Sequence, residues 1–519
     1  MGVSRRSGLA TPLFFVQSKR SVGVGELPDL ELLGDWCVSA GLSIIQLLPM
    51  NDVGLHFRPY DSESSIALEP MHLSAEKIKF VPLKKFLPAI RVLRKKFSRD
   101  SFWYDTSIKK EKLALFKKMF LARKKEGEAS FSRFKKENEF WLEDYALFKV
   151  IKQATGHAGW EHWPEDLKKR EPKALDHIRG GSKEEMEFQA WLQWQLFLQF
   201  QGAASSLRKK GVYLMGDLPF LASRDSADVW SHPDYFKLHL SAGAPPDFYF
   251  AGGQEWGMPP YDWNAMAGSG YDLLVEKLKY AAHFYDLFRI DHFVGFFRVW
   301  TFPREGAEEE RKARGAFDPP DEKEWERHGE RLLNVMLSSS AMLPCAEDLG
   351  TVPDCSFKVL EHYALPGMEV QRWTRDWKGT GDFKTPENYR LNSVVTLSTH
   401  DTSTFRTWWE EEATPEERLN YWKFLGLAGV PSEKCSKKLL AQALRAASQA
   451  RSIFSVQLFQ DWMGLSDVPE KGMEDKRINQ PGIVHEKNWR LRMPLYLEDL
   501  KKLALNKKIL EINQKTWRG

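Results

Sequence analysis

A series of short apolar runs, most of which end abruptly in polar or charged residues, constrains the fold of this chain more than any other feature. Seven of these runs are clear, and an eighth is expected near Ile453–Gln460. The seven cover residues 11–15, 42–49, 211–220, 286–293, 343–350, 368–373 and 392–401. Near-continuous apolar runs of this length are typical of strands that are covered on both faces, as in a parallel sheet.

Helical patterns lie between these runs, for example at residues 141–153, 191–210 and 271–285. A strand followed by a helix, repeated along the chain, indicates βαβ units. The sequence therefore predicts an α/β fold, a (β/α)8 TIM barrel with inserted helical subdomains. A doubly wound sheet is the alternative.

The length of 519 residues suits one barrel with large insertions, or two or three modest domains. The stretch between the second and third runs is long, helical and rich in lysine, and its lysine pairs are best explained as solvated helix faces. We expect four parts: residues 1–60 with the first barrel strands and helices, 61–205 as a mainly helical insertion, 206–465 with the remaining barrel and a loop at 245–263, and 466–519 as a loop-rich closing segment packed on the barrel.

Acidic residues stand where four of the predicted strands end. These are Asp217, Asp291, Glu347 and Asp401. Because the chemistry of a β/α barrel lies at the carboxyl ends of its strands, we expect the four side chains to share one rim. Carboxylates gathered in this way are candidates for acid, base and nucleophile.

Arg289 and Asp291 are two residues apart, so on a strand their side chains share a face. A guanidinium beside a carboxylate favours the ionised form, which a nucleophile in glycoside cleavage requires. On this motif alone, a structural Arg–Asp pair is an equally good explanation.

Glu347 and Asp348 are adjacent and would point to opposite faces of a strand, so only one can face the barrel mouth. We expect it to be the longer Glu347. A proton donor needs a raised pKa, which burial and a neighbouring carboxylate both supply. Alone the signal is weak, since such pairs in loops are usually solvated.

His400 and Asp401 end a β-branched run and suit hydrogen bonding to sugar hydroxyls. A Ser-His-Asp hydrolase is an alternative for these residues, but the chain has no GxSxG motif. There is also no HExxH motif and no His/Cys cluster with ligand spacing, and Gly23-Val24-Gly25 fails as a dinucleotide loop because Pro28 replaces the third glycine. We therefore expect neither a metal nor a cofactor. Together, the carboxylates support a retaining glycosidase scheme, in which one attacks the anomeric carbon and another protonates the leaving oxygen.

Composition limits the partners and the cellular location that we expect for the protein. The 75 basic residues nearly balance 71 acidic ones, which gives no electrostatic footprint for nucleic acid. No apolar stretch approaches the roughly 20 residues that cross a bilayer, the N-terminus makes a poor signal peptide, and the four cysteines have no disulfide-like spacing, so we expect a cytoplasmic protein. Twenty tryptophans are many; most belong to the core, but flat rings also match the apolar faces of sugars.

Four segments resemble one known family. FRIDHFVGFFR (288–298), AEDLG (346–350), THDT (399–402) and GDLPF (216–220) are similar to the 4-α-glucanotransferases, the amylomaltases or disproportionating enzymes of glycoside hydrolase family 77 in the α-amylase superfamily. The resemblance covers most of the chain and includes GGQEWGMPPYDW (252–263) and NQPGIVHEKNW (479–489).

The resemblance implies Asp291 as nucleophile, Glu347 as general acid/base and Asp401 as the group that stabilises the transition state. It implies that the glucan is bound by Tyr60, Asp217, Asp247, Gln254, Trp256, Arg289, His292, His400 and Asn479, with Trp489 in the closing segment.

The activity implied is transfer of α-1,4-glucan segments from a donor to the 4-OH of an acceptor glucan or glucose. The partners expected are α-1,4-glucans and maltooligosaccharides, and neither nucleic acid nor a membrane. Two alternatives stay open: a retaining α-glucan hydrolase, and an inactive glucan-binding protein. The presence of all three carboxylates argues against the second alternative.

Overall fold

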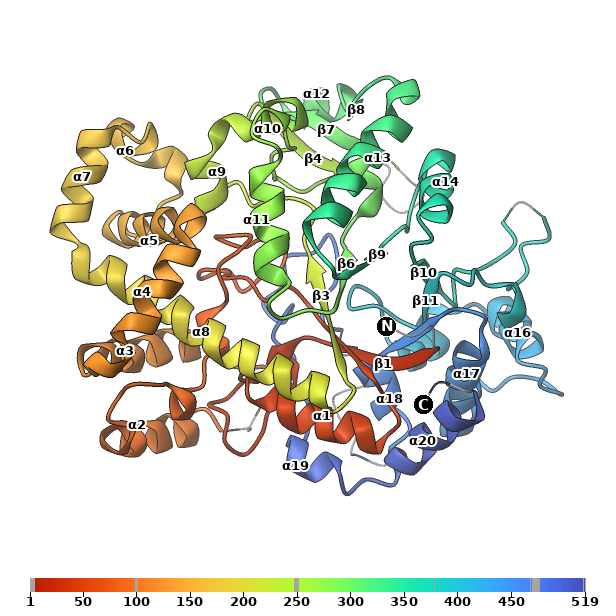
Figure 1. The fold of residues 1–519 in the computed structure, drawn as a ribbon. Helices are drawn as coiled ribbons and strands as arrows, with labels where there is room; N and C mark the ends of the chain where they lie inside the picture. Colours follow the sequence, from red (N-terminus) through yellow and green to blue (C-terminus); the bar gives the residue numbers. More distant parts are fainter. Residues whose placement is uncertain are drawn as a thin grey trace.

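Eight parallel strands form the central sheet of the protein (Figure 1). The computed structural model describes residues 5–98, 101–246, 252–377, 379–466, 468, 477–516 and 518. In sheet order the strands are β10 (Gly367–Val370), β11 (Ser393–Thr396), β12 (Phe454–Leu458), β1 (Arg6–Thr11), β2 (Ile44–Leu47), β3 (Tyr213–Leu218), β6 (Leu287–Ile290) and β9 (Leu343–Ala346). Every neighbouring pair in this order is parallel.

The two ends of this order, β9 and β10, come together and nearly close the sheet. The Ala346 N–H donates to the carbonyl of Pro366 at 2.7 Å, and the Met368 N–H donates to the carboxylate of Asp348, also at 2.7 Å. Curling an eight-stranded parallel sheet onto itself gives a β/α barrel. The predicted (β/α)8 barrel is confirmed, and a doubly wound sheet is excluded.

The first strand begins earlier in the chain than predicted. Residues 11–15 were expected as the strand, but β1 ends at Thr11 and a 3-10 turn, η1 (Leu13–Phe15), follows. Pro12 stands between them and has no N–H to donate to a strand ladder. No apolar run marks β1, because Arg6–Thr11 mixes polar and apolar residues. Gly8 allows β1 to approach β2 closely, since a Cβ at this position would lie 2.6 Å from the Ile44 carbonyl oxygen.

Helices surround the barrel (Figure 1). Those packed around it are α1 (Asp29–Ser39), α8 (Lys183–Lys209), α11 (Asp272–Ala281), α13 (Glu322–Ser339), α14 (Asp354–His362), α17 (Lys437–Gln449), α18 (Phe459–Met463) and α20 (Leu505–Lys515). Short or peripheral helices are α9 (Ala227–Ser231), α10 (Trp263–Ala267), α12 (Glu308–Ala313), α15 (Phe405–Thr407), α16 (Pro415–Phe424) and α19 (Leu497–Leu500). Both α19 and α20 belong to the closing segment 466–519, which was expected to be rich in loops and contains more helix than predicted.

A group of helices enters between β2 and β3 and lies to one side of the barrel in Figure 1. It comprises α2 (Leu83–Lys96), α3 (Ser107–Leu121), α4 (Glu128–Glu137), α5 (Glu139–Ala154), α6 (Glu165–Lys168) and α7 (Pro172–Gly181). The long helix α8 packs against α5 at one end of this group and against β3 of the barrel. α8 therefore connects the helical group rigidly to the strand that carries Asp217.

A second, antiparallel sheet was not predicted. Its strands, in sheet order, are β5 (Gln254–Glu255), β4 (Leu240–Ala244), β7 (Val299–Pro303) and β8 (Ala316–Asp318). β7 follows β6 after one 3-10 turn, η7 (Phe293–Phe296), so this sheet stands beside the carboxyl end of β6. The expected loop at 245–263 thus contains a strand, β5, and is attached to a rigid support.

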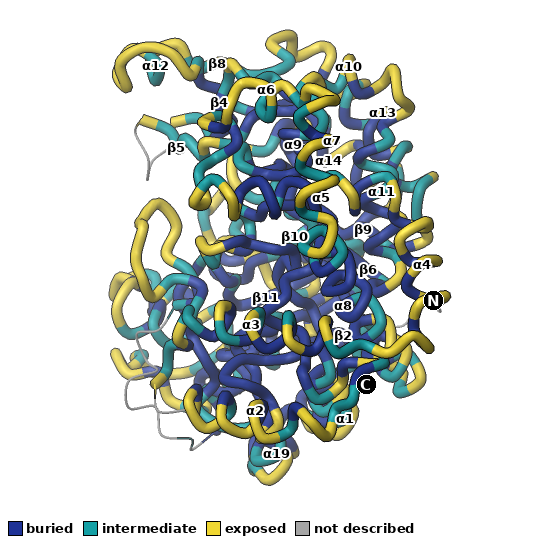
Figure 2. The backbone as a smooth tube through the Cα atoms, turned by 90° about the vertical axis from the view of Figure 1, so that its left-hand side faces the viewer, coloured by how far each residue is buried: buried dark blue, intermediate teal, exposed yellow. Residues whose placement is uncertain are grey.

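The inside of the barrel is packed. Buried apolar side chains from six of its strands meet in one cluster: Ile44, Met215, Leu287, Cys345, Val394, Phe454 and Val456. In Figure 2 the barrel strands are drawn almost entirely as buried, whereas exposed chain lies at the periphery. This filling leaves the carboxyl ends of the strands as the place for a site. Among the described helices, none has the length and apolar character needed to cross a bilayer.

Candidate active site at the carboxyl ends of the strands

The four predicted carboxylates lie at the same end of the barrel. Asp217 is on β3 and pairs in register with Arg289 on β6, while Asp291 and Glu347 follow β6 and β9 directly. The Glu347 N–H donates to the carbonyl of Ile290 at 3.0 Å, which continues the ladder to the point where both side chains project. A cavity of about 1790 Å³ opens here, and Asp291, Glu347 and Asp401 all line it.

The Arg289 guanidinium contacts three of these carboxylates. Its Nη1 donates to Asp217 Oδ1 and to Asp291 Oδ1, each at 2.8 Å, and its Nη2 lies 3.5 Å from Glu347 Oε2. Burial opposes the charge of this side chain, but the surrounding carboxylates outweigh it and raise the pKa of Arg289 well above its ordinary value. One permanent positive charge therefore holds Asp291 and Glu347 beside each other.

Glu347 sits in a pocket that favours its protonated form. Burial is the largest influence and, with the nearby charge of Asp291, raises the pKa of Glu347 to about 8. Arg289 and two backbone N–H donors, from His292 at 2.9 Å and Leu349 at 3.1 Å, act in the opposite direction but do not overcome burial. His292 reaches its position with a left-handed backbone (φ 45°). Near neutral pH, Glu347 can donate a proton.

The neighbouring Asp348 points elsewhere, as expected from strand geometry. Its fully buried carboxylate accepts from Arg390 Nη1 at 2.5 Å and from the Met368 N–H at 2.7 Å. Asp348 thus ties the end of β9 to β10 and closes the barrel, while Glu347 contacts Arg289.

Asp401 is held in its charged form. Burial acts to raise its pKa, but His400, a hydrogen bond from Asn479 and the charge of Arg289 together lower the pKa of Asp401 to about 2. Asn479 Nδ2 donates to Asp401 Oδ1 at 2.7 Å, and His400 Nε2 lies 3.2 Å from Asp401 Oδ2. The closing segment of the chain, through Asn479, therefore reaches the site.

Three aromatic rings, those of Tyr60, His400 and Trp489, pack together beside Asp217. The Tyr60 hydroxyl donates to Asp217 Oδ2 at 2.8 Å and lies 2.9 Å from His400 Nε2. The Tyr60 and His400 rings are stacked, with centroids 5.4 Å apart and planes at 14°, and Trp489 packs within 6 Å of both. A flat apolar surface edged by hydrogen-bonding groups is suited to a sugar ring.

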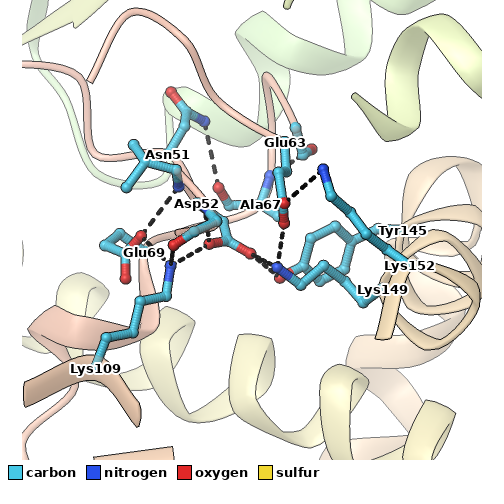
Figure 3. Close-up of polar contacts among 12 residues, drawn as sticks. Asn51, Asp52, Glu63, Ala67, Glu69, Lys109, Tyr145, Lys149 and Lys152 are labelled. Atoms are coloured by element: carbon cyan, nitrogen blue, oxygen red, sulfur yellow. Dashed lines mark hydrogen bonds and ion pairs between the residues drawn. The ribbon is translucent and has the colours of Figure 1, made fainter. Parts of the chain in front are cut away.

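Buried ion pairs connect the loop that carries Tyr60 to the inserted helices; Figure 3 shows these pairs. Lys109 on α3 contacts Asp52 Oδ1 at 2.7 Å and Glu69 Oε2 at 2.8 Å. Lys149 on α5 contacts Asp52 Oδ2 at 2.8 Å and also pairs with Glu63, three residues from Tyr60. These carboxylates flank Tyr60 in the chain, whereas the lysines belong to the inserted helices.

Two further contacts complete this network. Lys152 pairs with Glu63 at 2.8 Å, and the Tyr145 hydroxyl donates to Asp52 Oδ2 at 2.7 Å. Asp52 is fully buried, which opposes its charge, but Lys109 and Lys149 hold its pKa well below the ordinary value. The inserted helices therefore position Tyr60 at the barrel mouth.

Three further predicted site residues, Gln254, Trp256 and His292, lie beside the antiparallel sheet. Gln254 on β5 and Trp256 both line the cavity. The Trp256 and His292 rings are packed edge to face, with centroids 4.9 Å apart. Burial lowers the pKa of His292 to about 4, so this imidazole is neutral. Asp247 lies outside the described residues.

Two arginines that support the site were missed in the sequence. Arg390 holds Asp348 and Glu369, at 2.5 and 2.7 Å, and Arg477 donates to the backbone carbonyl of Asp401 at 3.2 Å. Neither belongs to a motif, and the partners lie 21 to 76 residues away in the chain, so no local signal could have identified them.

Known proteins resemble this chain along most of its length. The family model of the 4-alpha-glucanotransferases, glycoside hydrolase family 77, matches residues 11–498. The chain is 35% identical over 514 residues to a 4-alpha-glucanotransferase of Chlamydia pneumoniae, covering 98% of this chain and 94% of that protein. It is 30% identical over 459 residues to the 4-alpha-glucanotransferase of Thermus thermophilus, covering 85% and 86%.

A solved structure shares the fold. The amylomaltase from Streptococcus agalactiae, solved in complex with acarbose, superposes with a TM-score of 0.83 at 24% identity and covers 99% of this chain and 100% of its own. The family model and the identity to curated relatives together establish that the chain belongs to glycoside hydrolase family 77, the 4-α-glucanotransferases.

Proposed function

We propose that this protein transfers α-1,4-glucan segments by a retaining double displacement, with Asp291 as nucleophile and Glu347 as general acid/base. The observation that carries the proposal is the Arg289 guanidinium, which contacts both carboxylates at 2.8 and 3.5 Å while burial keeps Glu347 protonated near neutral pH. A protonated Glu347 that shares a guanidinium with the carboxyl group of Asp291 provides the acid and the nucleophile that double displacement requires.

In the first half-reaction, an Asp291 oxygen attacks the anomeric carbon and forms an ester bond to it. The glycosidic C–O bond breaks, and Glu347 gives its proton to the departing oxygen, which leaves as the 4-OH of the released glucan. Asp401, ionised and held by Asn479 and His400, stabilises the positive charge that develops on the sugar.

In the second half-reaction, Glu347 acts as a base. The charge of Asp291 is one cause of the raised pKa of Glu347, and this charge is lost in the ester. Glu347 then takes the proton of an acceptor 4-OH, whose oxygen attacks the anomeric carbon while the ester bond breaks. One glycosidic bond has been exchanged for another, and both carboxyl groups are restored.

The substrates we propose are α-1,4-glucans and maltooligosaccharides, and the sugar at the cleavage point would rest on the Tyr60 ring. Trp256 would contact the acceptor, because it lines the cavity beside His292 and Glu347. We also propose a cytoplasmic location, since all four cysteines are free thiols, as expected in a reducing compartment.

The experiment that tests transfer uses maltotriose alone. A transferase converts it to glucose and longer maltooligosaccharides while the total number of reducing ends stays constant. A hydrolase would raise the number of reducing ends together with glucose, and this result would overturn the proposal. An inactive glucan-binding protein would leave maltotriose unchanged. Asp291→Asn is the matched control, because loss of the nucleophile should lower turnover by several orders of magnitude.

A further inference from the structure

The exposed large apolar side chains in the described part of the chain fall into two kinds. Three are aromatic, namely Phe357, Trp373 and Trp377, with 41%, 43% and 70% of their surface exposed, and all three line the cavity that holds the carboxylates. The others are aliphatic, such as Leu391 and Val484, and none of these described side chains lines it. Scattered exposed apolar residues need no explanation, but aromatic rings gathered on one wall do.

The three rings come from neighbouring connections of the barrel. Phe357 is on α14, which follows β9, and Trp373 and Trp377 follow β10. In the sheet order β10 is four strands from β2 in either direction around the barrel, so these rings lie across the mouth from the Tyr60 loop. We call the three residues the aromatic wall.

The connection between β10 and β11 holds Trp377 exposed at the wall of the cavity. Arg375 and Phe383 form an antiparallel bridge at its base, and the Asp376 N–H donates to the Asp382 carbonyl at 2.9 Å. The Arg375 guanidinium stacks on Phe383 at 4.1 Å and pairs with Glu417 of α16 at 2.9 Å. These contacts fix the loop while leaving most of the indole in the open.

The one polar atom of the Trp377 ring is already satisfied. Its Nε1–H donates to the backbone carbonyl of Trp373 at 3.0 Å. The indole therefore offers the cavity an apolar face and needs no polar partner from a ligand. Such a face, inside a cavity lined by the catalytic carboxylates, matches the C–H face of a sugar ring in an uncharged polymer.

We propose that the aromatic wall is an outer glucan subsite, which binds glucose units of an α-1,4-glucan beyond those held at Asp291 and Glu347. This inference rests on the proposed function. The cavity of about 1790 Å³ exceeds the roughly 300–1,000 Å³ of small-molecule sites, as a polymer segment requires. The wall takes no part in the hydrogen bonds described at Asp291, Glu347 and Asp401. It would therefore bind ground state and transition state alike, and so lower KM for long chains without changing kcat.

The test compares donors of different length in Trp377→Ala. With maltoheptaose we expect KM to rise about five- to tenfold at unchanged kcat, as expected for loss of one aromatic contact. With maltotriose both constants should stay within twofold of wild type. Trp377→Phe should recover most of the loss, and Phe357→Ala should show the same dependence on length.

Leu391→Ala is the matched control, because Leu391 is 50% exposed on the same connection and does not line the cavity. It should leave both donors unaffected. If Trp377→Ala changed neither donor, or both equally, the wall would not be an outer subsite. These results would not affect the proposed function, provided that the wild type still disproportionates maltotriose. If the wild type did not, the proposed function itself would be contradicted.

Discussion

Glu347 keeps its proton near neutral pH because its burial outweighs a guanidinium and two backbone N–H groups that favour the charged form. The side chain of its neighbour Asp291 is less buried: 25% of its surface is exposed, compared with 12% for Glu347. The two residues are chemically alike, and their surroundings separate the roles of acid and nucleophile.

This difference predicts the alkaline limb of the pH profile. The general acid works only when protonated, so kcat/KM for maltotriose should fall as pH rises through about 8, the pKa of Glu347, and tenfold per pH unit above it. The measurement is an initial-rate series between pH 5 and 10, with circular dichroism at each pH to show that the fold persists. A rate that stayed constant to pH 10 would contradict the assignment of Glu347.

At the scale of residues, sequence reasoning located the charged groups that follow apolar strands. Asp217, Asp291 and Glu347 were placed correctly at strand ends because a parallel barrel brings all such ends to one rim. Arg390 and Phe357 could not be found, since each acts through a contact that only folding creates. The role of each site residue stays a prediction until variants are measured.

At the scale of elements, the loop between β2 and β3 that holds Tyr60 depends on helices that enter later in the chain. Lys109 on α3 and Lys149 on α5 both reach the fully buried Asp52. Buried ion pairs add little net stability when complete, but losing one partner leaves a charge without compensation. The helical insertion is thus part of the site, although it supplies no residue that we place at the reacting bond.

Lys149→Met should therefore destabilise the protein by about 3 kcal/mol, because Asp52 and Glu63 each lose a buried partner. Urea unfolding followed by tryptophan fluorescence measures this change. Lys169→Met is the control, since Lys169 pairs with Glu165 at the surface, where both side chains are 63% exposed, and should cost no more than about 0.5 kcal/mol. Similar losses in the two variants would refute the structural role of the network.

Elements were predictable where apolar runs marked them. Seven of the eight barrel strands lie within their predicted runs or begin one residue before them. β1 shares only Thr11 with its run, because Arg6–Thr11 mixes polar and apolar residues and Pro12 interrupts the apolar stretch that follows. The antiparallel sheet was not predicted for a related reason. β4 (LSAGA) has no apolar run, and β5 has only two residues; β4 is stabilised by pairing with β5 on one side and with β7 on the other.

At the scale of the whole molecule, the barrel is filled by side chains at its core and open at the carboxyl ends of its strands. Three structures surround that opening: the Tyr60 loop backed by the inserted helices, the antiparallel sheet with Trp256, and the aromatic wall after β9 and β10. A polymer lying across the mouth meets all three, so the fold provides both the reacting centre and the means to hold a chain on it.

The double-displacement mechanism depends on a covalent bond between the glucan and Asp291. Glu347→Gln incubated with α-maltotriosyl fluoride tests this most directly, because fluoride leaves without a proton donor, whereas the second half-reaction lacks its base. After acid quenching and peptic digestion, mass spectrometry should find the maltotriosyl group on the peptide that contains Asp291. A label on another residue, or no label while the fluoride is consumed with inversion at the anomeric carbon, would contradict the mechanism.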